Sequence, residues 1–297
     1  MSKKKVDFIV NPFAGTSLKE NIGDTIPKFL NTEIYDFEVF FTEYAGHGKE
    51  LAQKMVSGNT DIIVAFGGDG TVNEVASAVT CSEKVFALIP GGSGNGFSMH
   101  LGLGRSIKKA LTTINDHDIK RIDTCLLNGQ FYINVAGLGF DARVAYLTRE
   151  NNVRGFWQYF TTTIREAKNY KGHNMKIDID GKQLDGRYVA AVVANASRYG
   201  YNFTIAPTAQ LTDGVLDVML IHEASVFRYF LNAYRFLNKT LHKSKLTDSY
   251  TGKHIKIHSE DPLHYHLDGE GKETQQSFEF EIVPESLNLL IPREAKP

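Results

Sequence analysis

Two glycine-rich turns are the part of this sequence best suited to chemistry. The first reads Gly67-Gly68-Asp69-Gly70-Thr71 and the second reads Pro90-Gly91-Gly92-Ser93-Gly94-Asn95. Each follows a short apolar run, so each is expected at the carboxyl end of a parallel strand, where open α/β sheets bind ligands. Turns of this kind bare several backbone N–H groups, and a helix N-terminus behind them adds partial positive charge. A single Gly-Gly pair is equally well a tight turn, whereas two such turns in one sheet favour phosphate binding.

The carboxylate of Asp69 does not suit a simple anion site, because it repels phosphate. A divalent cation between the two groups removes this conflict. Mg²⁺ takes one or two carboxylates together with phosphate oxygens and waters. The first turn therefore predicts a magnesium-assisted phosphate site.

The common nucleotide-binding motifs are missing. No Gly-x-x-x-x-Gly-Lys-Ser/Thr occurs, and the second turn lacks the third glycine of Gly-x-Gly-x-x-Gly. The turn after the first strand, Asn11-Pro12-Phe13-Ala14-Gly15, does not supply it either. An NAD-dependent oxidoreductase is therefore disfavoured.

Alternation along a strand would place His264, His266 and Asp268 on one face. Two histidines and a carboxylate could bind zinc or iron in a hydrolase. Three ligands at this spacing are close to collinear, which suits tetrahedral coordination poorly. A solvated edge strand, or histidines that support Asp268, is the favoured interpretation.

A basic amphipathic segment spans residues 225–245, which hold five Lys or Arg and no Asp or Glu. One helical face would carry Phe227, Phe230, Leu231, Tyr234, Leu237 and Leu241, and another would carry Arg228, Arg235, Lys239 and Lys243. Basic amphipathic helices bind anionic membranes. Burial of the aromatic face against a sheet is favoured, with the basic face left for lipid head groups. Residues 149–171, which include Trp157, are a second docking candidate.

The first 125 residues or so must position the glycine turns. Apolar runs at residues 6–10, 34–42, 61–66 and 85–89 alternate with helical patterns, which predicts a parallel sheet built from βαβ units. Thr71 is expected to be the N-cap of the helix after the first turn, with Glu74 completing a capping box.

The rest of the chain has the pattern of an antiparallel β-rich domain. Hairpins are predicted at 121–135 around Asn128-Gly129 and at 175–194 around Asp180-Gly181, because Asn-Gly and Asp-Gly suit tight β-turns. Further strands are expected at 215–221, 254–258, 263–268 and 277–283, and helices at 155–170 and 225–241. The boundary between the two parts is expected near residues 116–123.

Composition limits the function classes. The 297 residues include 33 Lys or Arg and 34 Asp or Glu, so the net charge of −1 argues against nucleic acid as a partner of the whole chain. Two cysteines exclude a disulfide scaffold. No apolar run approaches the ~18 residues of a membrane span, and residues 1–7 lack the apolar stretch of a signal peptide. A cytoplasmic protein with reduced thiols is expected.

Asn11-Pro12, residues 67–74, residues 90–95 and Asp268-Gly269-Glu270, in this order, resemble the diacylglycerol kinase catalytic family. This family includes bacterial soluble lipid kinases, sphingosine kinases and ceramide kinases. The resemblance implies an α/β fold with an N-terminal three-layer, parallel-sheet ATP-binding domain, residues 1–123 plus 284–297. It also implies a C-terminal antiparallel β-sandwich that binds lipid, residues 124–283, with the active site between the two domains.

The resemblance also implies roles for individual residues. Those around ATP would be Asn11, Thr42, Gly67, Gly68, Asp69, Gly70, Thr71, Glu74, Ser93, Gly94 and Asn95. Asp69 would hold the catalytic Mg²⁺ through water, and Asp123 would belong to the same magnesium network. Asp268 would be the general base with Glu270 beside it, and Asp69 is the alternative base.

Two further elements follow from the resemblance. The side chain of Asp213 and the carbonyls of Gln210 and Val215 would bind a second, structural Mg²⁺, for which a plain hairpin turn is the alternative. Asp141 sits where sphingosine kinases place an aspartate near the lipid head group, and many bacterial members have a similar segment. The second glycine turn is also closer to the sphingosine kinase form than to the usual bacterial one.

Together these features predict an ATP- and Mg²⁺-dependent lipid kinase that converts diacylglycerol to phosphatidic acid. A sphingoid-base kinase is the second interpretation. An NAD kinase-like enzyme and a non-catalytic nucleotide-binding module are more remote. The expected partners are a membrane lipid and an anionic membrane surface at the inner face, and a homodimer is left open.

Overall fold

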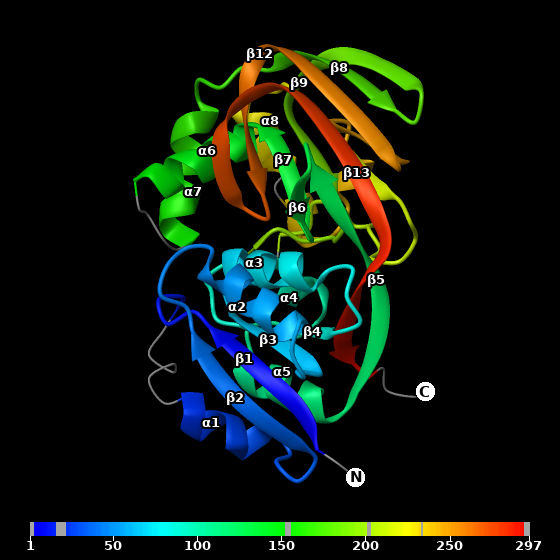
Figure 1. Ribbon diagram of the computed structural model, residues 1–297. Coiled ribbons are helices and arrows are strands. Elements are labelled where there is room, and N and C mark those ends of the chain that lie inside the picture. Colours follow the sequence, from blue (N-terminus) through cyan, green and yellow to red (C-terminus); the bar gives the residue numbers. More distant parts are fainter. Residues whose placement is uncertain (1–2, 16–21, 152–155, 201–202, 233, 294–297) are drawn as a thin grey trace. The chain divides into compact units, whose positions relative to one another are not determined.

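A computed structural model describes residues 3–15, 22–151, 156–200, 203–232 and 234–293 (Figure 1). The chain divides into two compact units, Met1–Ile122 with Glu285–Pro297, and Asp123–Pro284. Two strands, β5 (His117–Leu127) and β13 (Glu270–Pro292), run from one unit into the other. The first unit is built on a parallel sheet and the second on antiparallel strands, which confirms the predicted fold class.

The sheet of the first unit has the strand order β13–β4–β3–β1–β2, and its neighbouring strands are parallel. Its strands are β1 (Lys4–Val10), β2 (Tyr35–Phe41), β3 (Ile62–Gly67), β4 (Val85–Pro90) and the last residues of β13. Val10 pairs with both Phe41 and Phe66, and Gly67 pairs with Pro90. The strands therefore end level with one another, and the segments that follow them emerge at one edge of the sheet.

Helices cover both faces of this sheet. They are α1 (Ile22–Phe29), α2 (His47–Val56), α3 (Asp69–Val79), α4 (Gly96–His100) and α5 (Ile107–Asn115). Ile26 of α1 and Leu111 of α5 join Phe8 in one buried cluster, whereas α2 and α3 pack against each other and against β1 and β3. The result is a three-layer unit with its turns held on a rigid base.

The predicted cap of α3 is wrong. The helix begins at Asp69, its N-cap is Gly68, and no side chain caps it. Thr71 lies inside the helix, and Glu74 accepts N–H bonds from Gly46 and Gly48 instead of completing a capping box. The glycine turn passes directly into the helix, so the start of the helix is set by the sheet rather than by local capping residues.

The second unit is an antiparallel β-sandwich with the strand order β11–β10–β9–β7–β12–β13. Here β8 also pairs with β9 and β12, and β5 pairs with β6 and β13. The strands are β6 (Gln130–Tyr132), β7 (Val135–Gly139), β8 (His173–Ile179), β9 (Lys182–Ala194), β10 (Leu216–His222), β11 (Thr247–Gly252) and β12 (His254–Leu267). Tyr132, Val193 and Phe280 belong to one buried core drawn from most of these strands.

Three two-residue hairpins shape this unit. Their turn residues all have positive φ, namely Asn128 and Gly129, Asp180 and Gly181, and Asp268 and Gly269, as type I′ turns require. The first hairpin ends at Tyr132, so its predicted extension to residue 135 is wrong. Val135 begins β7, which pairs with β9 and β12. The two runs 254–258 and 263–268 form one strand, β12, interrupted by irregular pairing.

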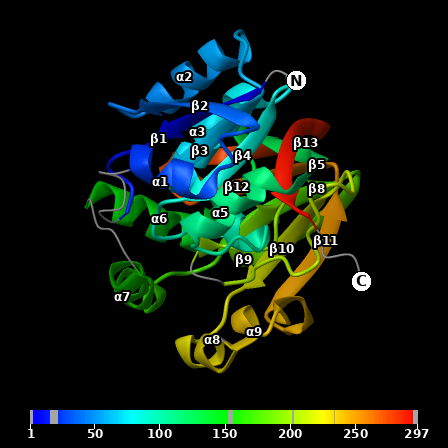
Figure 2. The same cartoon turned by 90° about the horizontal axis from the view of Figure 1, so that it is seen from below.

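The helices of the second unit are α6 (Phe140–Glu150), α7 (Phe156–Ala167), α8 (Val226–Asn232), α9 (Tyr234–Leu237) and a 3₁₀ turn, Leu241–Lys243. Figure 2 shows α7, α8 and α9 at the outer margin of this unit. Sequence patterning missed α6 and predicted one helix over 225–241, which is broken into shorter pieces. Lys239 has φ of 54°, which no α-helix accommodates. Residue 155 of the predicted helix 155–170 lies outside the described residues, and no helix among the described residues is long and apolar enough to cross a membrane.

Asp7 is a carboxylate buried in the middle of β1. Its side chain is 2% exposed, and its Oδ2 accepts a hydrogen bond of 2.5 Å from the Thr60 hydroxyl. Among the described residues its Oδ1 has no hydrogen-bond partner, and Lys5 Nζ lies 3.8 Å from Oδ2. Burial raises the pKa of Asp7, while Thr60 and Lys5 partly oppose the rise. Desolvation of the charged form is thus the dominant effect at this position.

We therefore expect Asp7 to make the stability of the protein depend on pH. A carboxyl whose pKa is raised on folding binds its proton more tightly in the folded state. The free energy of unfolding therefore falls as pH rises through the raised pKa and the folded protein must hold the buried charge. The variant Asp7→Asn cannot ionise, and its melting temperature relative to wild type should increase between pH 4 and pH 7, by about 2–4 °C for each kcal/mol. Thermal unfolding at several pH values measures this. Asp36→Asn, at an exposed ion pair with Lys3, is the control. A difference that shrinks as pH rises would mean that Lys5 outweighs burial.

Candidate functional site

Three turns meet at the carboxyl edge of the parallel sheet. They follow β1, β3 and β4, and comprise residues 11–15, 67–71 and 91–95. The backbone N–H of Asn11 donates to Phe66 O at 2.9 Å, and that of Gly91 donates to Gly67 O at 2.7 Å. Main chain thus lies against main chain at this edge, which brings the sequence-predicted phosphate turns together.

Glycine is required here by close approach. A Cβ atom on Gly92 would lie 2.5 Å from Gly68 Cα, and one on Gly67 would collide with the side chain of Thr71. Gly15 has φ of +75°, and a Cβ there would strike Gly91 O. Any side chain at these points would push the turns apart, so the glycines serve to pack three backbone segments into one cradle.

Asp69 joins the first turn to the second. Its Oδ2 accepts the N–H of Asn95 at 2.9 Å and its Oδ1 accepts the N–H of Gly96 at 2.8 Å. These N–H groups stand at the start of α4, where helix N–H groups have no intrahelical partner. The half-buried carboxylate therefore fixes the second turn, in addition to any role toward a cation.

Asn95 closes the second turn. It has a left-handed conformation with φ of 53° and is 4% exposed. Its Oδ1 accepts the Gly92 N–H at 2.9 Å and its Nδ2 donates to Gly92 O at 2.7 Å. Ser93 at the tip is exposed to solvent, and Gly94 is partly so. The turn is a small ring that Asn95 locks from inside.

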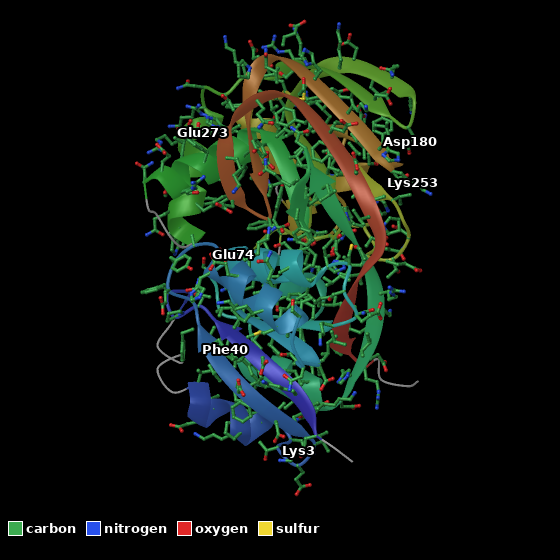
Figure 3. The ribbon with its side chains drawn as sticks, in the orientation of Figure 1. Lys3, Phe40, Glu74, Asp180, Lys253 and Glu273 are labelled. Carbon is green, nitrogen blue, oxygen red and sulfur yellow. The ribbon has the colours of Figure 1, made fainter. Side chains whose placement is uncertain are left out.

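The remaining residues predicted around ATP have diverse contacts. Asn11 Nδ2 donates to the Thr71 hydroxyl at 3.1 Å, which ties the first strand to α3. Thr42 is buried after β2 and its N–H bonds to Val10 O at 2.9 Å. Glu74, labelled in Figure 3, holds the start of α2 through the N–H groups of Gly46 and Gly48 at 2.8 and 3.1 Å. Its carboxylate shapes the neighbouring loop.

Two features at this edge were not predicted. Arg105 Nη2 donates to Ser93 O at 2.7 Å, which brings a guanidinium to the second turn. Tyr44 stacks on His47 after β2, with ring centroids 4.7 Å apart and an interplanar angle of 7°. Arg105 is ten residues beyond the turn and belongs to no recognisable sequence motif, so only the fold shows that it reaches the turn.

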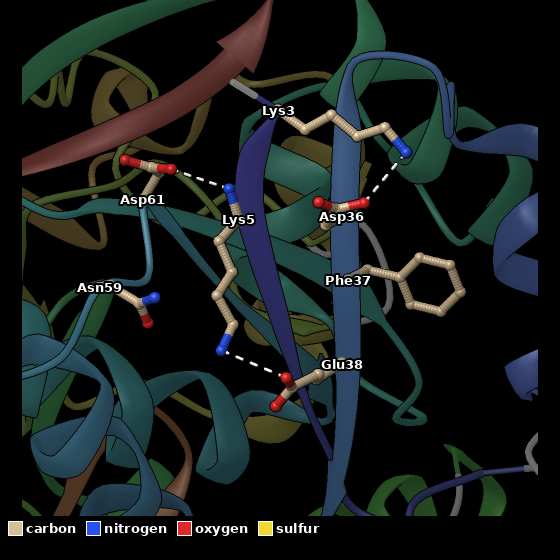
Figure 4. A pocket seen from close by; sticks show the side chains of 7 residues that line it. All are labelled: Lys3, Lys5, Asp36, Phe37, Glu38, Asn59 and Asp61. Carbon is tan, nitrogen blue, oxygen red and sulfur yellow. Dashed lines mark hydrogen bonds and ion pairs between the residues drawn. The ribbon is translucent and has the colours of Figure 1, made fainter.

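A hollow of about 340 Å³ lies at the opposite, amino end of the same strands (Figure 4). Its charged groups are paired with one another, since Lys3 contacts Asp36 at 3.1 Å and Lys5 Nζ contacts Glu38 at 3.3 Å. Asp61 accepts the backbone N–H of Lys5 at 2.8 Å. Because parallel sheets bind ligands at their carboxyl ends, and because these charges are already paired, we assign no role to this hollow.

In the second unit, Asp268 occupies the first position of the β12–β13 turn, with φ of 50°. Its Oδ1 accepts the N–H groups of Asn134 and Val135 at 2.8 and 3.1 Å, and its Oδ2 accepts that of Ile133 at 3.1 Å. The segment before β7 thus holds the carboxylate in one orientation. Glu270 lies beyond the turn and pairs with Lys272 at 3.1 Å.

The same arrangement occurs at Asp180, in the β8–β9 turn. Its carboxylate accepts the N–H groups of Lys253 and His254 at 2.8 and 2.9 Å, and Figure 3 shows Asp180 beside Lys253. These bonds lower the pKa of Asp180. We call such a turn aspartate, whose carboxylate accepts backbone N–H groups of a neighbouring segment, a clamp. Because the sandwich also uses a clamp at Asp180, Asp180 serves as a structural control for Asp268.

Asp123 lies close to the segment predicted to bind the structural magnesium. It is 1% exposed, its Oδ2 accepts the Gly214 N–H at 2.8 Å, and its own N–H donates to Leu211 O at 2.7 Å. Within that segment Asp213 and Gln210 are exposed, and Val215 is half-buried. The fold thus gathers two aspartates and backbone carbonyls around one loop.

Asn195 was not predicted, although it connects the surroundings of Asp123 and Asp268. It is 1% exposed, and its Nδ2 donates to Asp123 O and Ile133 O, both at 2.9 Å. In the part of the chain that the structure describes, the Oδ1 atoms of Asn195 and of the neighbouring buried Asn134 have no hydrogen-bond partner. Buried acceptors of this kind call for a donor such as an ordered water.

Asp141 lies at the start of α6 in a dense network. Its Oδ2 receives the Tyr199 hydroxyl at 2.5 Å and His266 Nε2 at 3.0 Å, and its Oδ1 accepts the Ala142 N–H at 2.9 Å. The Gly269 N–H donates to His266 Nδ1 at 3.3 Å, so Nε2 carries the proton shared with Asp141. Burial and the Asp141 carboxylate raise the pKa of Tyr199 well above its ordinary value, so its hydroxyl stays protonated.

The alternative metal site at His264, His266 and Asp268 is wrong. Irregular pairing between His264 and Tyr265 interrupts the alternation of β12. His264 stacks on Tyr146, with ring centroids 4.2 Å apart, whereas His266 binds Asp141 and Asp268 binds main chain. Among the described residues, no three His, Cys, Asp or Glu side chains gather as a metal cluster.

Comparisons with known proteins identify the family of the chain. The family model described as the diacylglycerol kinase catalytic domain matches residues 5–127, and the one described as the YegS C-terminal NAD kinase beta sandwich-like domain matches residues 134–291. A diacylglycerol kinase of Bacillus subtilis is 27% identical over 277 residues, which cover 90% of each chain. A diacylglycerol kinase of Staphylococcus saprophyticus is 25% identical over 229 residues, which cover 75% of each chain.

A solved structure shares the fold. The crystal structure of a diacylglycerol kinase from Bacillus anthracis superimposes with a TM-score of 0.78 at 24% identity, and the match covers 99% of this chain and 98% of that one. The two family models together account for nearly the whole sequence, in the order that the motifs predicted. The chain therefore belongs to the bacterial lipid kinase family that carries the diacylglycerol kinase catalytic domain, and it is a lipid kinase.

Proposed function

We propose that this lipid kinase transfers the γ-phosphoryl group of ATP to the hydroxyl of diacylglycerol and so produces phosphatidic acid. The observation that carries the proposal is the packing of three turns, two of them glycine-rich, main chain against main chain at the carboxyl edge of the parallel sheet. Backbone N–H groups at such an edge form a cradle for phosphate.

The residues predicted around ATP divide into two groups in this proposal. Backbone N–H groups of the turns, together with the side chains of Ser93 and Thr71, would meet phosphate oxygens. Asn11, Thr42, Glu74 and Asn95 would keep the turns and their neighbours in place, because their side chains or amides bond to other parts of the same unit.

Mg²⁺ suits the oxygen donors of the first turn. A carboxylate has about four lone-pair directions, so Asp69 can accept two N–H groups and still bind a cation through water. When bound, the ion would neutralise charge on the phosphates. Asp69 would then both fix the second turn and orient the water ligands of the ion. Asp123 would contribute to the same network in the proposal.

The chemical step needs a base near the lipid hydroxyl. The hydroxyl oxygen forms a bond to the γ-phosphorus, the bond to the bridging oxygen of ADP breaks, and the hydroxyl proton must leave. Asp268 is the proposed acceptor of this proton, because three N–H groups hold its carboxylate in a fixed orientation at an exposed turn. Glu270 would influence the same turn through its charge, and Asp69 is the alternative base.

The surroundings of Asp141 favour diacylglycerol over a sphingoid base. A sphingoid base carries an ammonium group, which a carboxylate binds well only if its oxygens are open to it. Tyr199, His266 and the Ala142 N–H already donate to Asp141. The Asp141 side chain is also only 14% exposed, so with three donors already bound it leaves little room for an ammonium group and suits a neutral hydroxyl head group better.

We further propose that the segment 210–215 binds a second, structural Mg²⁺ through Asp213 and the carbonyls of Gln210 and Val215. Burial raises the pKa of the neighbouring Asp217, and the charge of Asp213 adds to the rise. A cation near these carboxylates would offset their repulsion. All of the proposed donors are oxygens, which Mg²⁺ prefers.

A lipid substrate implies contact with a bilayer, so we propose peripheral binding to an anionic membrane at the cytoplasmic face.

One experiment tests the whole proposal. The purified protein is incubated with a membrane lipid extract, labelled ATP and Mg²⁺, and products are resolved by mass. Labelled phosphatidic acid supports it. Labelled NADP from added NAD would favour the NAD kinase-like alternative, and ATP binding without any labelled product would favour a non-catalytic module.

Asp69→Asn should reduce kcat by about 10²-fold or more, because an amide neither attracts a cation nor accepts both N–H groups of the second turn. Steady-state kinetics with Mg²⁺ titration measures this, and circular dichroism checks the fold. Asp61→Asn is the matched control, since Asp61 precedes the same strand at its other end and accepts the Lys5 N–H. Kinetics of Asp69→Asn that equal wild type would contradict the assignment.

Asp268→Asn should keep ATP affinity and lose ~10²-fold or more in kcat, because positioned acid–base groups contribute ~10²–10⁴-fold. Asp180→Asn disturbs an equivalent clamp and should lose similar stability with kcat unchanged. Comparing the two variants separates chemistry from structure. If Asp268→Asn retains activity while Asp69→Asn binds Mg²⁺ and ATP but is inactive, Asp69 is the base. If both remain active, the proposed mechanism is wrong.

Wild-type enzyme should phosphorylate diacylglycerol at least ~10-fold faster than sphingosine when the two compete in mixed micelles, a difference of about 1.4 kcal/mol. Tyr199→Phe removes a donor from Asp141 and should shift this ratio toward sphingosine. Tyr188→Phe, at a ring buried elsewhere in the unit, should leave the ratio unchanged. A wild-type preference for sphingosine, or a ratio insensitive to Tyr199, would refute this reasoning about the substrate.

A further inference from the structure

The helices α8 and α9 present an apolar surface to solvent. Phe227, Phe230, Leu231 and Tyr234 are 68%, 75%, 53% and 50% exposed. The first three follow a spacing of three and four residues and so share one face of α8. The expected burial of these side chains against the sheet is therefore wrong. Soluble helices turn such a stripe toward the core, and a contiguous exposed patch marks a binding surface.

Other residues attach this segment to the unit. The Tyr229 hydroxyl donates to His222 O at 2.7 Å and accepts the Ala224 N–H at 3.0 Å. Asn232 Oδ1 accepts from Arg235 Nε at 3.0 Å and from Ser244 Oγ at 3.2 Å. Leu241 is buried in the core of the unit. The exposed stripe thus points away from the contacts that hold the segment, so the fold does not use it.

The charges around the stripe indicate what covers it. Residues 225–245 contain five Lys or Arg and no Asp or Glu, although the chain as a whole has a net charge of −1. Arg228, Lys239, Lys243 and Lys245 are exposed. Arg235 is half-buried and bonded to Asn232 and to Thr240 O, so it belongs to the attachment rather than to the surface.

An anionic bilayer fits this surface better than a second copy of the chain. Aromatic side chains beside basic ones suit the boundary between acyl chains and anionic head groups. A symmetric dimer through the stripe would bring the same basic segment against itself and cost like-charge repulsion. Phosphate head groups instead supply the opposite charge over the whole surface.

We infer that the exposed face of α8 and α9 inserts into the interface of an anionic membrane, with Arg228, Lys239, Lys243 and Lys245 on phosphate head groups. The inference rests on the proposed function, since a diacylglycerol substrate resides in a bilayer. It assigns the docking surface to the stripe and treats Trp157 of α7, which is also exposed, as the competing location.

Vesicle sedimentation tests the stripe. Wild-type protein is mixed with vesicles of phosphatidylcholine alone or with phosphatidylglycerol. Phe227→Ser/Phe230→Ser should weaken binding to the mixed vesicles at least ~10-fold, because each phenylalanine forfeits apolar burial. Ile34→Ser/Ile119→Ser is the matched control, since these side chains are 46% and 47% exposed elsewhere, and it should bind like wild type.

The basic residues are tested separately. Replacing Arg228, Lys239, Lys243 and Lys245 with Gln should abolish the preference for phosphatidylglycerol and most of the salt dependence, because exposed charges are screened over ~8 Å at physiological ionic strength. Arg235→Gln should destabilise the segment without changing the salt dependence.

The outcomes distinguish the inference from the proposed function. Turnover of a short-chain, water-soluble diacylglycerol should be equal in wild type and in Phe227→Ser/Phe230→Ser, whereas turnover in vesicles should fall. If wild type turns over neither substrate, only the proposed function is refuted, because vesicle binding is measured independently of turnover. Wild-type binding by the double serine variant, loss of binding on Trp157→Ser alone, or a dimer that the double variant dissociates would each overturn the inference.

Discussion

Backbone N–H groups that a turn leaves without a partner need acceptors, and in this chain three aspartates proposed to act in the site provide them. Asp69 accepts two from the start of α4, Asp268 accepts three from the segment before β7, and Asp123 accepts one from Gly214. Each bond fixes a turn and a carboxylate at the same time. The groups proposed to handle magnesium and protons are thus oriented by the main chain before any ligand arrives, and pre-organisation of this kind lowers the cost of reaching a transition state.

This dual use explains which parts of the site could be predicted from sequence. The glycine turns were recognisable because strand patterns place them at one edge of a sheet and because few other residues tolerate such close packing. The partners of the carboxylates could not be predicted from the sequence. They are main-chain N–H groups, which nearly every residue has, so no residue type marks them. Asn195 illustrates the limit, because its contacts with Asp123 and Ile133 depend on β5, the segment before β7 and the end of β9 meeting.

The fold was predictable where periodicity is strong and less so where packing overrides local signals. The parallel strands follow from runs of apolar residues. The hairpins at Asn128 and Asp180 follow from the Asn-Gly and Asp-Gly pairs at their turns. Thr71 and Glu74 have the spacing of a capping box. The Thr71 hydroxyl instead accepts a hydrogen bond from Asn11, and the Glu74 carboxylate accepts N–H groups at the start of α2. The stripe on α8 has the periodicity of a buried helix and is nevertheless exposed, because periodicity reports which residues share a face and not what covers it.

The charge balance of the cradle completes the case for a cation. The three turns, residues 11–15, 67–71 and 91–95, contain no Lys or Arg, and Asp69 gives them a net charge of −1. Amide dipoles can orient the phosphates of ATP, yet they carry no net charge to offset them. Arg105 reaches the second turn but bonds to the carbonyl of Ser93. If the cradle binds the phosphates of ATP as proposed, it needs a cation from solution to offset their charge beside a carboxylate, and Asp69 then suits the proposed magnesium-dependent mechanism.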